Sequence, residues 1–195
     1  MKTIKRYLMR RIVIFASGSG TNAENIIKYF QKSTVATVVQ VLSNKKDAKV
    51  LERSNDLNVK SLHFNRNDFV NTDIILNLLK KEADFIILAG FLWRVPQKII
   101  KAFPDKIVNI HPALLPKYGG KGMYGMYVHN AVIANKERET GITIHYVNEN
   151  YDEGAIIFQK SVAVDKDDTA EGVAKKIHQL EMKYFPKIIE DLLKS

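Results

Sequence analysis

Continuous aliphatic stretches alternate along the first half of the chain with stretches in which apolar residues recur at helical spacing. The aliphatic stretches predict strands at residues 12–16, 35–42, 59–64, 85–89 and 107–110. The helical spacing predicts helices at residues 22–31, 47–55 and 68–81 and a shorter one after Pro96. Strands that are apolar throughout are typical of a parallel sheet covered on both faces. The alternation therefore predicts an α/β fold with a doubly wound, mostly parallel sheet and right-handed crossovers.

The pattern changes after residue 111. A glycine-rich loop occupies residues 112–125, a helix is predicted at 128–134, and two β-rich stretches follow at 142–147 and 155–164. An apolar stripe at helical spacing then consists of Val173, Ile177, Leu180 and Tyr184. It predicts a long C-terminal helix that Pro186 should kink or end. No repeat or linker interrupts the chain, so residues 12–195 are expected to form a single domain.

The chain has 195 residues and a formal net charge of +9. The first eleven residues contain no acid and five basic residues: Lys2, Lys5, Arg6, Arg10 and Arg11. We interpret residues 1–11 as a loosely ordered basic lead-in rather than a nucleic-acid-binding arm. The absence of cysteine excludes disulfides, thiolate catalysis and cysteine-based metal sites, and it favours a reducing cytoplasm. No apolar run approaches the roughly 20 residues of a membrane span.

The strongest local signal is the segment Ser17-Gly18-Ser19-Gly20-Thr21-Asn22, which follows the first strand and opens the first helix. Glycines let the backbone approach a ligand closely, and a helix N-terminus attracts anions, so the segment predicts a phosphate site. It is not a Walker loop, because no Gly-Lys-Ser/Thr follows. With Ala23 it also matches a dinucleotide-binding pattern. The second strand ends in Ser43, Asn44, Lys45 and Lys46 without the acid that contacts NAD, which leaves NADP as an alternative to a phosphate monoester.

Asn109 and His111 lie on the same side at the end of the fifth predicted strand, where Pro112 stops the strand. Asp152 lies in an acidic turn after a later strand. Asn can stabilise an oxyanion, His can move a proton near neutral pH, and Asp can orient the imidazole and raise its pKa. The three residues are therefore candidates for acyl transfer without a protein nucleophile.

Several motifs occur in an order found in one family. They are the first-loop segment Ser17 to Asn22, Ala89-Gly90-Phe91-Leu92, the run Asn109-Ile110-His111-Pro112-Ala113-Leu114-Leu115-Pro116-Lys117-Tyr118, Gly141-Ile142-Thr143-Ile144-His145-Tyr146-Val147, and Asp152-Glu153-Gly154. From Arg11 onward the chain resembles the folate-dependent phosphoribosylglycinamide formyltransferases. The Asn-Ile-His-Pro block is specific for folate-dependent formyl transferases as a group, and the first loop narrows the resemblance to this branch. The resemblance implies the single-domain formyltransferase fold.

The resemblance also implies a role for individual residues. The catalytic residues fall on Asn109, His111 and Asp152. The ribonucleotide contacts fall on Gly20, Thr21, Asn22, Ala23, Glu24, His178 and Glu181. The folate contacts fall on Arg66, Leu92, Trp93, Arg94, Val95 and Asn109. His145, on a neighbouring strand, either supports the catalytic residues from behind or is a packed strand residue.

The activity that the resemblance implies is transfer of a formyl group from the co-substrate 10-formyltetrahydrofolate to the amine of glycinamide ribonucleotide, in purine biosynthesis. Asn109 and protonated His111 are expected to stabilise the tetrahedral intermediate, and Asp152 to keep His111 charged. No metal, nucleic acid or membrane is expected, and both a monomer and a homodimer are compatible with the sequence. The alternatives are a hydrolase similar to formyltetrahydrofolate deformylase and a non-catalytic NADP-binding Rossmann protein. The chain length argues against methionyl-tRNA formyltransferase, which carries an additional domain.

Overall fold

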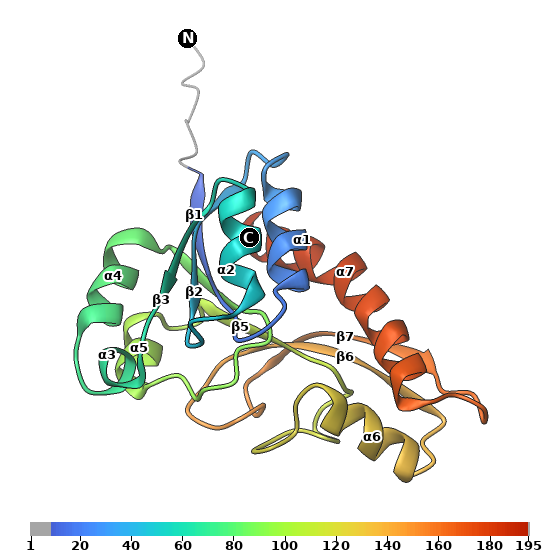
Figure 1. Cartoon of the computed structure of the whole chain (residues 1–195). Coiled ribbons are helices and arrows are strands. Elements are labelled where there is room, and N and C mark those ends of the chain that lie inside the picture. Colours follow the sequence, from blue (N-terminus) through green and yellow to red (C-terminus); the bar gives the residue numbers. More distant parts are fainter. Residues whose placement is uncertain (1–8, 195) are drawn as a thin grey trace.

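The computed structural model describes residues 9–194 (Figure 1). Its strands are β1 (Arg10–Phe15), β2 (Ala36–Ser43), β3 (Lys60–His63), β4 (Phe85–Leu88), β5 (Ile107–His111), β6 (Glu139–Tyr146) and β7 (Ile156–Ala163). Its helices are α1 (Thr21–Phe30), α2 (Lys49–Asp56), α3 (Arg66–Val70), α4 (Ile74–Glu82), α5 (Gln97–Ala102), α6 (Met126–Ala134) and α7 (Ala170–Lys194). Residues 1–8, most of the expected basic lead-in, lie outside the described residues. Arg10 and Arg11 already belong to β1, which begins two residues before its predicted start.

Within residues 9–194 the strands form one seven-stranded sheet in the order β3-β2-β1-β4-β5-β6-β7. Strands β1 to β5 pair in parallel, and β6 and β7 are antiparallel to their neighbours. The predicted mostly parallel α/β sheet is therefore confirmed. Within the sheet, β2 and β3 lie on one side of β1, and β4 lies on its other side. The connections that leave β1 and β4 therefore run in opposite directions from the middle of the sheet. Ligands of open α/β sheets bind at such a point, outside the carboxyl ends of the strands.

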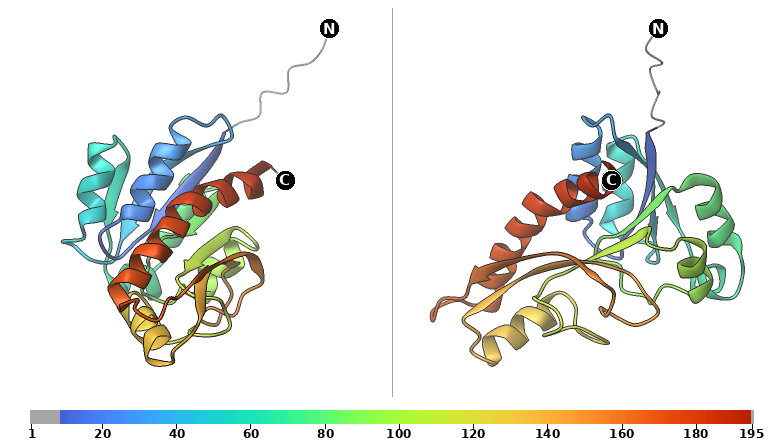
Figure 2. Two further views of the ribbon diagram at one scale, coloured as in Figure 1. Left: turned by 90° about the vertical axis from the view of Figure 1, so that its right-hand side faces the viewer. Right: turned by 180° about the vertical axis from the view of Figure 1, so that it is seen from behind.

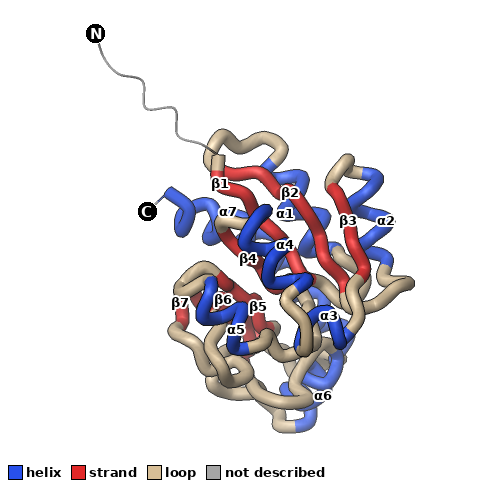
Figure 3. The backbone as a smooth tube through the Cα atoms, turned by 90° about the vertical axis from the view of Figure 1, so that its left-hand side faces the viewer, coloured by secondary structure: helices blue, strands red, loops and turns tan. Residues whose placement is uncertain are grey.

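Helices cover both faces of the sheet (Figures 2 and 3). Helices α1, α2 and α7 lie on one face, and α3, α4 and α5 lie on the other. The last four residues of β1 alternate between the two cores: Ile12 and Ile14 belong to the first, and Val13 and Phe15 to the second. All four are at most 2% exposed. The doubly wound arrangement thus explains why the strand is apolar at all four of these consecutive positions.

The predicted helix at residues 68–81 is two helices in the structure. The Oδ1 atom of Asn65 accepts a hydrogen bond from the Asp68 backbone N–H (2.9 Å), and α3 therefore begins at Arg66. Thr72 then donates from its hydroxyl to the Asp68 carbonyl oxygen (3.1 Å). Such side-chain bonds compete with the helical backbone, so residues 71–73 form a turn before α4 begins.

The predicted long C-terminal helix is α7, and Pro186 does not end it. Phe185 and Ile189 are buried on either side of the proline, in the core beneath α7. The Glu190 carboxylate also accepts hydrogen bonds from the Tyr29 hydroxyl (3.0 Å) and the Ser33 hydroxyl (2.8 Å). These contacts with α1 and the segment after it offset the backbone hydrogen bond that a proline removes, so the last turns remain helical.

Gly141 in β6 offers a test of how tightly the antiparallel part of the sheet is packed. A Cβ atom at this position would lie 2.1 Å from the Lys160 carbonyl oxygen in β7 and 2.6 Å from the Leu114 side chain. We expect Gly141→Ala to lower the free energy of unfolding by about 1–3 kcal/mol, because the β7 backbone cannot move without breaking the ladder. Gly172→Ala, in α7 with its nearest neighbours at 3.5 Å, should instead raise it by about 0.5–1 kcal/mol. Urea denaturation of both variants measures the difference, and equal midpoints would contradict the packing argument.

Candidate active site

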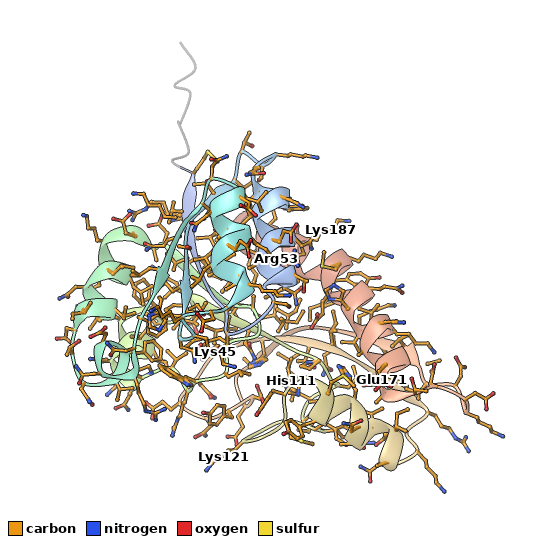
Figure 4. All side chains as sticks on the ribbon, in the orientation of Figure 1. Lys45, Arg53, His111, Lys121, Glu171 and Lys187 are labelled. Atoms are coloured by element: carbon orange, nitrogen blue, oxygen red, sulfur yellow. The ribbon has the colours of Figure 1, made fainter. Side chains whose placement is uncertain are left out.

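A cavity of about 730 Å³ lies at the carboxyl ends of β1, β4 and β5. Its walls come from the loop after β1, the segments after β4 and β5, the turn after β6, and helices α6 and α7. The lining residues include Ser17, Gly18, Ser19, Asn22, Lys45, Leu92, Asn109, His111, Lys121, Tyr124, His129, Tyr151, Asp152, His178 and Glu181. Figure 4 shows Lys45, His111 and Lys121 in the lower half of the molecule, on the side of α6. The position agrees with the point at which the topology predicts a ligand.

The first loop has the geometry of an anion site. Gly20 caps α1 with a left-handed backbone (φ 77°), and a Cβ atom there would lie 2.4 Å from a methyl group of Val50. Only glycine therefore fits at this position. The first backbone N–H groups of a helix have no helical acceptor, so those of α1 are available to a ligand.

Ser17 joins two walls of the cavity. Its hydroxyl donates to Asn44 Oδ1 (2.6 Å) and accepts from the backbone N–H of Leu92 (3.0 Å). Ser17 is 2% exposed, so these bonds are shielded from water. They fix the segment after β4 relative to the loop after β1.

Asn109, His111 and Asp152 meet at this cavity. The Nδ1 atom of His111 lies 3.5 Å from Asp152 Oδ2, and the Nδ2 atom of Asn109 lies 3.5 Å from Asp152 Oδ1. The Nε2 atom of His111 is 2.7 Å from the Tyr118 carbonyl oxygen, to which it donates. The structure thus brings together the three residues that the sequence placed on separate segments.

Asp152 is held in place by the glycine-rich loop. The backbone N–H of Gly120 donates to Asp152 Oδ2 (2.9 Å). This approach requires glycine at residue 119, where a Cβ atom would lie 2.6 Å from Leu115 and 3.3 Å from the Asp152 side chain. Asp152 itself has a left-handed backbone (φ 57°), which Asp tolerates better than most residues. The turn and the loop therefore fix the carboxylate from two sides.

His145 belongs to the same cluster. It pairs with Asn109 across the antiparallel β5–β6 ladder. Its Nε2 atom lies 3.1 Å from Asn109 Nδ2 and 3.6 Å from Asp152 Oδ1, and its Nδ1 atom donates to the Tyr146 carbonyl oxygen (2.8 Å). With a proton on its Nδ1 atom, the His145 ring presents Nε2 as an acceptor for the Asn109 amide. Of the two sequence interpretations, the geometry favours the one in which His145 helps to position Asn109 and Asp152 over that of a packed strand residue.

Burial governs the charge of His111, which is 3% exposed. Burial lowers the pKa of His111 below its ordinary value, although the Asp152 charge and the Tyr118 carbonyl oxygen act to raise it. The Asp152 contribution has the predicted sign, but it is smaller than the effect of burial. The expected protonated His111 is therefore not the favoured state of the free protein at neutral pH. For Asp152, burial raises the pKa, but the His145 contact, the His111 charge and the Gly120 N–H together lower it.

The expected ribonucleotide residues divide into two groups. Asn22, His178 and Glu181 line the cavity: Asn22 Nδ2 donates to Glu181 Oε2 (2.9 Å), and His178 Nδ1 lies 3.4 Å from the same oxygen. The second group does not line the cavity and consists of Gly20, Thr21, Ala23 and Glu24. Ala23 is buried in the core, and the Glu24 carboxylate pairs with Lys28 and Arg53. Ala23 and Glu24 can therefore contact a phosphate only through their backbone.

The expected folate residues are more dispersed. Leu92 and Asn109 line the cavity, whereas Arg66, Trp93, Arg94 and Val95 do not. Val95 is 7% exposed and belongs to the core beneath α5. The Arg66 guanidinium lies over the Trp93 ring, 5.5 Å from its centroid, and Trp93 packs against Phe64, Phe69 and Phe91. Arg66 and Trp93, both expected to contact folate, therefore contact each other, but they do so beside the cavity and do not line it.

Sequence reasoning missed several residues of the cavity. They are Ser17 as a bridging residue, and Lys45, Lys121, Tyr124, His129 and Tyr151. Lys121 and Tyr124 lie in the glycine-rich loop at residues 112–125, whose composition does not indicate which side chains face the cavity. His129 lies in the helix predicted at residues 128–134, and a lone histidine in a helix is more often structural than functional.

Residues 9–194 contain no group of three or more His, Asp or Glu side chains arranged to hold a metal ion. In the same residues no helix is both long and apolar enough to cross a membrane.

A sheet of this order, with an anion-type first loop and an Asn-His-Asp cluster at its carboxyl edge, is the arrangement of a formyl transferase. The formyl transferase family model matches residues 10–189, and the chain belongs to this family.

The relatives carry a more specific name. The chain is 35% identical to the phosphoribosylglycinamide formyltransferase of Bacillus subtilis, over 95% of each chain, and 37% identical to the chloroplastic enzyme of the same name from Arabidopsis thaliana, over 92% of this chain. It spans less than two thirds of the length of the plant relatives, 64% for Arabidopsis thaliana and 62% for Vigna unguiculata. A crystal structure of glycinamide ribonucleotide transformylase 1 from Geobacillus kaustophilus superimposes with a TM-score of 0.86 at 34% identity, over 95% of this chain and 100% of that one. The resemblance that the motifs indicated is confirmed.

The contribution of Asp152 to the charge of His111 is testable. We expect Asp152→Asn to lower the pKa of His111 further, because the carboxylate favours the imidazolium and the amide does not. An NMR titration of the His111 ring proton measures this pKa. His178, whose pKa is raised by its contact with Glu181, is the internal control and should not change. An unchanged or higher His111 pKa would show that Asp152 does not act through its charge.

Proposed function

We propose that the protein transfers a formyl group from 10-formyltetrahydrofolate to the amine of glycinamide ribonucleotide, as a step of purine biosynthesis, with residues 12–195 as one catalytic domain. The observation that carries the proposal is the convergence of Asn109, His111 and Asp152 on a cavity that also contains the first loop and Glu181. In this cavity the first loop suits the phosphate of the acceptor substrate and the Glu181 carboxylate suits its amine. Asn109 and His111 suit the oxygen of the formyl group. Membership of the formyl transferase family and the names of the relatives support the proposal.

The ribonucleotide lies along the cavity from the first loop to α7. Its phosphate accepts hydrogen bonds from the backbone at the N-terminus of α1, and its amine faces Glu181, which Asn22 and His178 hold in place. Transfer of one proton from the ammonium form to solvent leaves the lone pair that attacks. The reduced folate enters beside Leu92, whose backbone is fixed by Ser17.

The amine attacks the formyl carbon directly, and the formyl oxygen becomes an oxyanion in a tetrahedral intermediate. When the intermediate collapses, the bond between the formyl carbon and N10 of the folate breaks. The second proton, which the attacking nitrogen loses after it has bonded to the formyl carbon, passes through water to N10. The Nε2 atom of His111 and the Nδ2 atom of Asn109 donate to the oxyanion, which replaces Asp152 Oδ1 as the acceptor of the longer Asn109 bond (3.5 Å). Each well-placed donor contributes on the order of 10²–10³ in rate.

The charge of His111 responds to the reaction. In the free protein its Nε2–H donates to the Tyr118 carbonyl oxygen, and the formyl oxygen takes the place of that acceptor. The negative charge that develops next to the ring raises its proton affinity, and Asp152 lies 3.5 Å from Nδ1 to balance the second proton. Burial therefore keeps His111 neutral before the reaction, and the imidazolium is favoured only when the oxyanion forms.

The mechanism predicts the effect of removing each catalytic side chain. We expect Asn109→Ala, His111→Ala and Asp152→Ala each to lower kcat by about 10²-fold or more, because each removes a donor or the charge that supports one. Formyl transfer at saturating substrate concentrations measures kcat. Turnover close to that of the unchanged protein in His111→Ala would refute the mechanism.

A second assay separates the transferase from a hydrolase. Formate release without an amine acceptor should be negligible, whereas a deformylase would release it at the full rate. In thermal shift, glycinamide ribonucleotide and a folate analogue should both raise Tm; a response to NADPH alone would favour the dinucleotide alternative.

The first loop provides the matching test of substrate binding. We expect Gly20→Leu to abolish measurable binding of glycinamide ribonucleotide, because the side chain meets Val50 and displaces the backbone that contacts the phosphate. Isothermal titration measures binding, and Gly172→Ala, which lies away from the loop, is the control. His111→Ala should keep its affinity for the ribonucleotide, and a similar loss in both variants would contradict the assignment of the loop.

A further inference from the structure

His129 has no role in the mechanism above, although it lies in the wall of the same cavity. It belongs to the first turns of α6 and is 5% exposed. Its Nδ1 atom is enclosed and has no hydrogen-bond partner among the described residues. Buried polar atoms without a partner are rare in proteins, so this one needs an explanation.

The enclosed Nδ1 atom determines which proton His129 carries. A proton on Nδ1 would have no acceptor, whereas a bare lone pair leaves no donor unsatisfied, so the neutral ring carries its proton on Nε2. Nε2 is not among the enclosed atoms, and the ring lines the cavity, so Nε2 is the edge that opens onto it. Burial lowers the pKa of His129, the nearby Glu181 acts to raise it and His111 to lower it. His129 therefore offers the cavity a neutral N–H donor.

The neighbours of His129 define what this donor can meet. Glu181 lines the same cavity as His129, and its carboxylate repels a phosphate at this point. A ligand group that satisfies both residues has a cationic or donor atom towards Glu181 and an acceptor oxygen towards His129. An amine next to an amide carbonyl has this arrangement.

We propose that His129 is a further substrate-binding residue, whose Nε2–H donates to the amide oxygen of the glycinamide arm while Glu181 binds the amine. The inference rests on the proposed function, because it assumes an acceptor substrate with an amine beside a carbonyl. It goes beyond that function by assigning a residue that selects this chemical group. The two contacts orient the amine towards the formyl carbon held at Asn109 and His111.

Two variants separate this role from a structural one. His129→Gln places an amide N–H near the position of Nε2, whereas His129→Leu has similar bulk without a donor. We expect His129→Leu to weaken binding of glycinamide ribonucleotide about tenfold, in line with loss of one buried hydrogen bond. His129→Gln should recover most of that loss. The KM for 10-formyltetrahydrofolate should stay within about twofold in both.

Stability provides an independent readout. His129→Leu removes the enclosed nitrogen without a partner, so its Tm should equal or exceed that of the unchanged protein. His63→Gln, on the exposed end of β3, is the control and should change neither binding nor Tm. An analogue with CH₂ in place of the amide carbonyl should bind the unchanged protein and His129→Leu equally weakly.

The outcomes distinguish the two proposals. If the unchanged protein binds the ribonucleotide but transfers no formyl group, the proposed function fails while titration still tests His129. Unchanged affinity in His129→Leu, equal losses in the Gln and Leu variants, or a lower Tm with losses for both substrates would overturn the role of His129.

Discussion

The carboxylate of Asp152 is the point at which the separate parts of the site are joined. It accepts a hydrogen bond from the Gly120 backbone and lies beside the side chains of Asn109, His111 and His145. These residues come from the glycine-rich loop and from two antiparallel strands. A single negative charge in a buried position therefore orients the Asn109 amide, which donates to it, and stabilises a positive charge that develops on His111.

The topology of the sheet explains why this cluster lies next to an anion site. The strands that follow β1 and the strands that follow β4 lie on opposite sides of this pair in the sheet. The loop after β1 and the segment around Leu92 therefore lead away from each other at the middle of the sheet. Strand β5 ends beside them and carries Asn109 and His111 to the same edge. Ser17 then binds the two diverging segments together through its hydroxyl. The cavity is thus a result of strand order, and its walls are made rigid by a small number of buried hydrogen bonds.

The same cavity contains groups that reduce the stability of the fold. His111 and His129 are buried with lowered pKa values, and Nδ1 of His129 and Oδ1 of Asn22 lack partners among the described residues. Each costs free energy in the empty protein. A ligand cannot reach these enclosed atoms, but it can bond to the edge of the His129 ring that faces the cavity, so the site is arranged for its substrates rather than for the stability of the free chain.

The sequence by itself determined the order of strands and helices, the position of the first loop, and the placement of Asn109 and His111 at a strand end, because these depend on local periodicity and on glycine and proline. It did not determine the break at residues 71–73, the continuation of α7 past Pro186, or the neutral state of His111. Only the tertiary structure decided that Asp152 reaches His111, that His145 faces Asn109, and that His129 lies in the cavity. These depend on antiparallel register, loop packing and burial, which join residues far apart in the chain.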